Sequence, residues 1–248
     1  KNIKLNEFYG KWLTSYIVGV NYQGYKSGHL THHSYTATEN DAVSDSEKYA
    51  IVDFKDPKIY LLFVKDLFGF TSLKIFFNYG NELKKVNPSS FGKKIFNLFK
   101  MSIIQLIILS LFGFDIFLYF LFWLYPAIGP HMFLMRIRGI AEHGLAKQLN
   151  YYVTKTSEGQ YFTRSFLTNV NKYKITPLIW IEKLLIGSFF VYYHHEHHLN
   201  ANIPYYNLNK FHNLLKNKVN NYVKAPVYEK GYFSAALRTV LVQKEELY

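Results

Sequence analysis

Two stretches of this chain carry the same histidine pattern. Residues 28–33 read Gly-His-Leu-Thr-His-His and residues 194–198 read His-His-Glu-His-His, so both contain His-x-x-His-His. On a helix, positions i, i+3 and i+4 share one face, so the three imidazoles of each box could point to one locus. Imidazole suits iron, zinc, copper and nickel. Because clustered imidazoles are costly to bury and serve no packing purpose, the duplicated pattern favours a metal site over surface or core histidines.

Composition narrows the classes of site and partner. The chain has no cysteine, which excludes disulfides, thiolate metal sites, iron–sulfur clusters and cysteine nucleophiles. Its 22 Phe and 22 Tyr suit a membrane-embedded or interfacial protein. The formal charge of +12 would also fit a nucleic-acid binder. We nevertheless predict no nucleic-acid partner, because the basic residues flank apolar segments and form no single stripe. Those around the longest segment are Lys93, Lys94, Lys100, Arg136 and Arg138.

The longest apolar segment, residues 101–135, contains a single charged residue, Asp115. As one helix it would be about 52 Å long, whereas the hydrocarbon core of a bilayer is about 30 Å thick. The tripeptide Gly113-Phe114-Asp115 is a plausible turn. We therefore predict a transmembrane hairpin of two helices, 95–112 and 115–133. Both of its ends carry Lys or Arg, which places them in the cytoplasm by the positive-inside rule.

A buried hairpin of a soluble protein is the alternative, and it is less favoured because 101–111 and 114–123 are apolar all round. We predict an all-α fold in one domain: a membrane hairpin, interfacial helices over 57–77 and 175–193, and a cytoplasmic helical cap that carries the boxes. Its predicted regions are 6–56 with the first pattern, 57–94 with an interfacial helix and a polar loop over 78–94, the hairpin 95–133, the cytoplasmic region 134–215, and the basic tail 216–248.

Three runs of residues resemble one family. They are the two boxes, Arg-Ile-Arg-Gly-Ile-Ala-Glu-His-Gly over 136–144, and His-His-Leu-Asn-Ala-Asn-Ile-Pro-Tyr-Tyr-Asn-Leu over 197–208. Over residues 6–215 the chain resembles the integral-membrane fatty acid desaturases. The resemblance implies two non-haem iron ions with O2 as co-substrate. It implies as metal ligands and catalytic residues His29, His32, His33, His143, His194, His197 and His198; His195 is a variable position of its box.

The resemblance also implies a reaction and its partners. The family removes two vicinal hydrogens from an acyl chain, so the expected substrate is an acyl-lipid or acyl-thioester in a lipid membrane. The two electrons would come from a separate ferredoxin or cytochrome b5-type donor, since the chain has no cysteine for an iron–sulfur module and no His-Pro-Gly-Gly haem motif. A hydroxylase or ketolase of the same superfamily, acting on a carotenoid, alkane or sphingolipid, is the alternative.

Three acids and two further histidines complete the predicted surroundings of the site. Asp41, Glu142 and Glu196 adjoin the ligands and are candidates to accept the second imidazole N–H, with solvated acids as the alternative. We expect His131 to be an interfacial residue and His212 a surface histidine.

The chain departs from the family pattern at its start. The family has a first box, His-x(3–4)-His, before the other two, yet no histidine precedes His29 and the chain begins at Lys1 rather than Met. We therefore expect the first box to precede Lys1 and these 248 residues alone to be inactive. A smaller departure is Asp41-Ala42, where the family often has Asp-Pro. A membrane metal transporter is less favoured, because such a protein would place histidines inside its spans and 101–130 has none.

Overall fold

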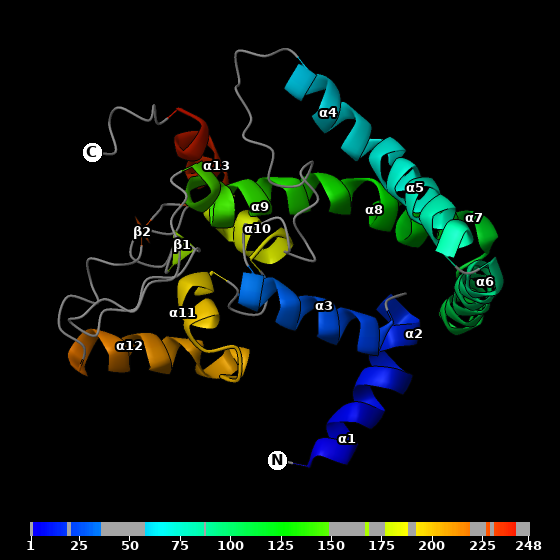
Figure 1. Cartoon of the computed structure of the whole chain (residues 1–248), viewed down its shortest axis with the longest axis horizontal. Helices are drawn as coiled ribbons and strands as arrows, with labels where there is room; N and C mark the ends of the chain where they lie inside the picture. Colours follow the sequence, from blue (N-terminus) through cyan, green and yellow to red (C-terminus); the bar gives the residue numbers. More distant parts are fainter. Residues whose placement is uncertain are drawn as a thin grey trace. The chain divides into compact units, whose positions relative to one another are not determined.

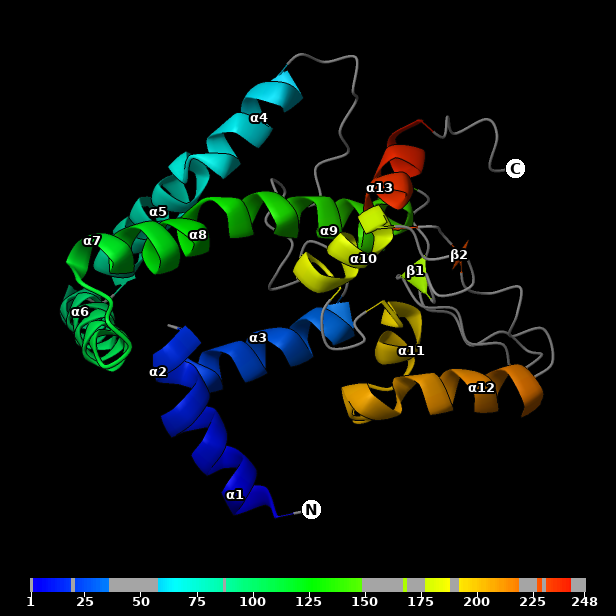
Figure 2. The same ribbon diagram turned by 180° about the vertical axis from the view of Figure 1, so that it is seen from behind.

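The computed structural model is predominantly helical (Figures 1 and 2). The structure describes residues 2–18, 21–35, 58–86, 88–148, 167–168, 177–187, 192–218, 227–228 and 231–241. It divides into two compact units, the first of Lys1–Leu30 with Tyr60–Phe133 and the second of Thr31–Ile59 with Leu134–Tyr248. The predicted helical class is thus confirmed, and the described parts of both units are mainly helical.

Helices make up the described part of the first unit. They are α1 (Ile3–Phe8), the π-helix η1 (Tyr9–Thr14), α2 (Ser15–Val18), the start of α3 (Tyr22–Tyr35), α4 (Lys58–Leu67), α5 (Phe70–Val86), α6 (Pro88–Ser110), α7 (Ile116–Tyr119), the π-helix η2 (Phe120–Leu124), α8 (Tyr125–Ile128) and the start of α9 (Pro130–Gln148). The side chain of Asn2 caps the first of them by accepting a hydrogen bond from the Leu5 N–H.

The predicted turn in the apolar stretch lies where α6 ends. Gly113 has a φ of +84°, which glycine adopts without steric cost, and Asp115 caps α7 by accepting a 2.8 Å hydrogen bond from the Leu118 N–H. Within the described residues one helix, Ile116–His143, is long and apolar enough to cross a membrane, and the apolar helix Ile95–Ser110 before the turn is shorter. The helix break is therefore at the predicted place, with one candidate span after it.

Two other predictions for the first unit need correction. The interfacial helix expected over 57–77 is two helices, α4 and α5, which meet at Gly69 with a φ of +81°. The stretch 78–94, predicted to be a polar loop, is helical on both sides of residue 87, which lies outside the described residues. Its Glu, Leu and Lys residues favour helix, and Pro88 is the first residue of α6, a position where proline costs no hydrogen bond.

The described part of the second unit holds the end of α3, most of α9 and seven further elements in the order of the chain. These are β1 (Leu167–Thr168), α10 (Pro177–Leu185), α11 (His194–Leu199), the 3-10 helix η4 (Tyr205–Asn207), α12 (Leu208–Lys218), β2 (Val227–Tyr228) and α13 (Tyr232–Leu241). The two strands pair in parallel over two residues each, the only departure from helix among the described elements. Both views show α10 and α13 beside the end of α9 (Figures 1 and 2).

Apolar side chains of three helices form the core of this unit. They come from α9, α10 and α13, and among them are Ile137, Ile140, Ala141, Ile179, Ala235 and Ala236. Pro177 opens α10, as its position before an apolar run predicts. The core therefore fixes the last turns of α9, which carry Glu142 and His143.

Candidate metal centre

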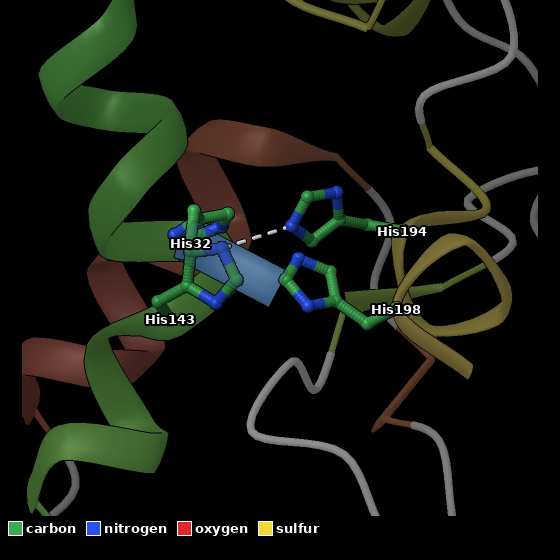
Figure 3. Close-up of side chains that lie close together, drawn as sticks. All are labelled: His32, His143, His194 and His198. Atoms are coloured by element: carbon green, nitrogen blue, oxygen red, sulfur yellow. Dashed lines mark hydrogen bonds between the residues drawn. The ribbon is translucent and has the colours of Figure 1, made fainter. Parts of the chain in front are cut away.

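Four histidines of the second unit face one another. His32 at the end of α3 and His143 on α9 lie opposite the two histidines of α11, His194 and His198 (Figure 3). One ring nitrogen of each lies within 4.8 Å of those of the other three. His32, His143 and His194 are buried, and His198 is partly buried. Three segments that are far apart in the sequence thus supply one cluster of imidazoles, which could hold a metal ion.

The spacing of the nitrogens fits a metal ion at the centre of the cluster. The Nε2 atoms of His194 and His143 are 2.9 Å apart, and those of His33 and His197 are 3.0 Å apart. A metal–imidazole bond of about 2.1 Å places neighbouring ligands of an octahedral site about 3.0 Å from each other. Each pair is at the distance of a hydrogen bond between two imidazoles, and two ligands of one ion would have a similar separation.

Each histidine box divides between two groups. On α11, His194 and His198 join the four-histidine cluster, whereas His197 pairs with His33. On α3, His32 belongs to the cluster, whereas its neighbour His33 pairs with His197. We predicted one locus per box from the helical spacing alone. Adjacent positions on a helix are about 100° apart, so neighbouring histidines of one box face different partners.

His29 lies one turn before His33 on α3. Positions i and i+4 of a helix share a face, so this imidazole extends the side of α3 that carries His33. Its ring stacks on that of Tyr25, with 5.6 Å between the ring centroids. His29 and His33 therefore share one face of α3, and His32 lies on another.

Glu142 contacts the ring nitrogen of His194 that faces the cluster. Its Oε2 is 3.2 Å from His194 Nε2, the same nitrogen that faces His143. We predicted that this acid would contact the other ring nitrogen. Arg138, one turn earlier on α9, donates from Nε to both carboxylate oxygens at 2.9 Å. Only the spacing of four residues between Arg138 and the acid indicates this contact in the sequence.

Glu196 has a partner that the sequence did not indicate. Its Oε1 is 2.6 Å from Nδ1 of His212 on α12, and the two residues are 0 % and 3 % exposed. His212 is therefore a buried partner of the histidine box, and its prediction as a surface residue is wrong. The pair joins α11 to α12 and supports the helix that carries three candidate ligands.

The remaining predicted residues either belong to neither group of possible ligands or lie outside the described residues. His195 is buried but is in neither group of possible ligands, in keeping with its variable position in the box. His131 is exposed and is likewise in neither group. Asp41 lies outside the described residues.

Burial keeps two imidazoles of α11 neutral, those of His194 and His198. Burial lowers the pKa of His194 well below its usual value, and the neighbouring His198 and His143 lower it further. Burial, followed by His143 and His33, has the same effect on the pKa of His198. Because a metal binds the neutral imidazole, these two residues are in their ligand form at neutral pH.

This shift predicts how the stability of the metal-free chain depends on pH. Below pH 6.5 these two histidines are protonated in the unfolded chain but stay neutral in the folded chain. The unfolded state therefore binds more protons. Each histidine then removes up to about 1.4 kcal/mol of stability per pH unit. We expect the melting temperature of chelator-treated protein to fall between pH 7.0 and 5.5, above the range in which unfolded carboxyl groups titrate.

The matched variant is His194→Asn, which removes one of the two titrating groups. Its melting temperature should fall less over the same pH range. An unchanged or rising melting temperature for the parent chain at pH 5.5 would contradict the assignment of these histidines as neutral.

Comparison with known proteins gives one match. The sequence profile of the family described as fatty acid desaturase matches residues 1–229, which include all three histidine segments and the helices on either side of Gly113. No curated protein and no solved structure matches the chain.

Proposed function

Since the chain belongs to the fatty acid desaturase family, we propose that it is a membrane diiron enzyme that introduces a double bond into an acyl chain. The substrate would be an acyl-lipid or acyl-thioester, and the reaction would use O2 and two electrons. The observation that supports this most directly is the cluster of buried imidazoles, with the second pair beside it. Family members are membrane-associated and act on lipids, and the long apolar helix of this chain is in keeping with that class.

We assign the seven histidines to two iron ions. One ion would bind His32, His143, His194 and His198, and the other would bind His33 and His197. The family resemblance adds His29, which shares one face of α3 with His33. Bound iron would supply the O2 chemistry that removes hydrogen from an unactivated C–H bond, a step beyond the reach of side chains alone. The division of each box between two groups supports two ions rather than one.

The protein residues have separate tasks in this proposal. The neutral imidazoles of His194 and His198 would bind metal without first releasing a proton. Arg138 and Glu142 form an ion pair whose carboxylate lies beside Nε2 of His194, where it would adjoin bound iron.

The apolar helices would place the site at a membrane surface. We propose that the helices on either side of Gly113 enter the bilayer together, with the acyl chain lying along them. Phe96, Phe99, Ile107 and Phe117 on these helices are exposed, as lipid-facing residues would be. Arg136 and Arg138 follow the apolar part of α9, so the positive-inside rule places the histidines on the cytoplasmic face.

The donor of electrons would be a separate protein. The net charge of +12 would favour an acidic ferredoxin or cytochrome b5 through complementary charge. Anionic lipid is attracted by the same charge, so the identity of the donor is best tested by reconstitution with each purified protein.

Lipid analysis tests the proposed reaction. The complete reading frame is expressed in a host that supplies both types of donor, and its fatty acids are analysed by mass spectrometry. We expect new carbon–carbon double bonds that are absent when His194 and His198 are replaced with alanine. New hydroxyl or keto groups would instead support the hydroxylase alternative, and an unchanged lipid profile from iron-loaded protein would contradict both.

A further inference from the structure

Tyr232 begins α13 and is fully buried, with 0 % of its surface exposed. Its hydroxyl lies against the carboxylate of Glu142 without completing a hydrogen bond of standard geometry among the described residues. A buried hydroxyl ordinarily needs a partner, and a carboxylate is a strong acceptor. Tyr232 also lies beyond residues 1–229, the part of the chain that matches the family. Its place beside the candidate metal centre is therefore a feature that the family match does not cover.

Glu182 on α10 fixes the start of α13. Its Oε2 accepts a 2.6 Å hydrogen bond from the Tyr232 backbone N–H, and the carboxylate also accepts from the backbone N–H of Phe233. Glu182 is only 4 % exposed although α10 is an apolar helix. A buried carboxylate is costly unless it is hydrogen-bonded, so this contact specifies where the first turn of α13 lies.

Two glycines allow this close packing. A Cβ on Gly187 would lie 2.7 Å from the ring of Tyr232 and 3.1 Å from its hydroxyl oxygen. A Cβ on Gly231 would overlap the Glu182 carboxylate. A side chain at either position would therefore clash with Tyr232 or with Glu182.

Glu142 connects Tyr232 to the candidate metal ligands. Glu142 is bound by Arg138 at both oxygens and lies 3.2 Å from Nε2 of His194. Burial, with the charge of Glu142 as the next cause, raises the pKa of Tyr232 well above its usual range. The phenol therefore keeps its proton and can act as a donor to the acid.

We propose that Tyr232 is a positioning residue of the metal centre, which holds the Glu142 carboxylate beside the metal-facing nitrogen of His194 and makes α13 part of the site. The proposal rests on the proposed function, because it presumes that the histidine cluster binds a metal ion. A tyrosine that only filled space in the core could be replaced by phenylalanine with no effect on the metal. Removal of a residue that orients the groups around a metal ion typically lowers metal affinity by about 10- to 100-fold.

Cobalt(II) titration of the full chain in detergent tests this proposal without reference to activity. The visible absorption of bound cobalt(II) reports both its affinity and its ligand geometry. The variants are Tyr232→Phe, Glu142→Gln and the double variant, with Tyr206→Phe, an exposed tyrosine on η4, as the matched control. Far-UV circular dichroism verifies that each variant retains its helix content.

We expect Tyr232→Phe to weaken cobalt binding by about tenfold and to shift its absorption bands, with the control unchanged. In the double variant the loss should equal that of Glu142→Gln alone, because both changes act through the same carboxylate. Unchanged binding and spectrum in Tyr232→Phe, or fully additive losses, would overturn the proposal. A parent chain that binds no cobalt would instead overturn the metal centre itself.

A second variant covers the case in which Tyr232→Phe does not fold. Glu182→Gln keeps the tyrosine but weakens the anchor of α13, since a neutral amide is a poorer acceptor than a carboxylate. It should shift the cobalt spectrum in the same direction as Tyr232→Phe. A parent-like spectrum in this variant would count against the role of α13.

Discussion

Replacing His198 with alanine is expected to remove most of the iron from the chain. Its ring centroid lies 4.3 Å from that of His33 and 4.5 Å from that of His194, so it contacts members of both groups. Loss of this imidazole removes a ligand and leaves a cavity between the others. We expect the affinity for iron to fall by more than about 100-fold, the upper range for residues that only support a ligand. Iron per chain, measured by mass spectrometry after dialysis against a chelator, checks this.

His131→Ala is the matched control for this substitution. His131 is a histidine of the same chain, but it is exposed and in neither group of possible ligands. Its replacement should leave the iron content unchanged. Equal iron content in the two variants would mean that the iron is bound elsewhere.

The second large effect is expected at His212. Its replacement with alanine leaves the Glu196 carboxylate buried without its 2.6 Å partner. Breaking such a buried pair typically costs about 3–5 kcal/mol. For a chain of this size about 1 kcal/mol corresponds to about 2–4 °C, so the melting temperature should fall by at least about 6 °C. Differential scanning calorimetry in detergent, with metal removed, measures this directly.

Asn213→Ala tests whether the effect is specific to the pair. Asn213 is the next residue on α12 but is exposed, and its side chain donates a 3.2 Å hydrogen bond to Oδ1 of the exposed Asn209. Its replacement should change the melting temperature by less than about 2 °C. A similar small change for His212→Ala would show that α11 does not depend on the Glu196 contact.

Local patterns in the sequence predicted the features that depend on neighbouring residues. Gly113 and Asp115 indicated the end of α6 and the start of α7, because each has a conformational or capping preference of its own. The histidine spacing indicated a metal site on helices. The spacing could not predict the partner of each imidazole, because His32 and His33 differ only in the side of α3 that they occupy.

Contacts between separate elements could not be predicted from the sequence. No sequence motif surrounds His212, and its pairing with Glu196 depends on the packing of α12 against α11. Tyr232 likewise reaches Glu142 only because α10 anchors the start of α13. Each contact requires the packing of the second unit, which no local pattern encodes.

The division of each histidine box has a mechanical consequence. His197 and His198 are consecutive residues of a six-residue helix, and they serve different groups. A small rotation of α11 about its axis would displace an imidazole of each group at once. In the proposed diiron site, displacement of one metal position would therefore displace the other, and we expect iron bound at one position to rigidify the second and raise its affinity.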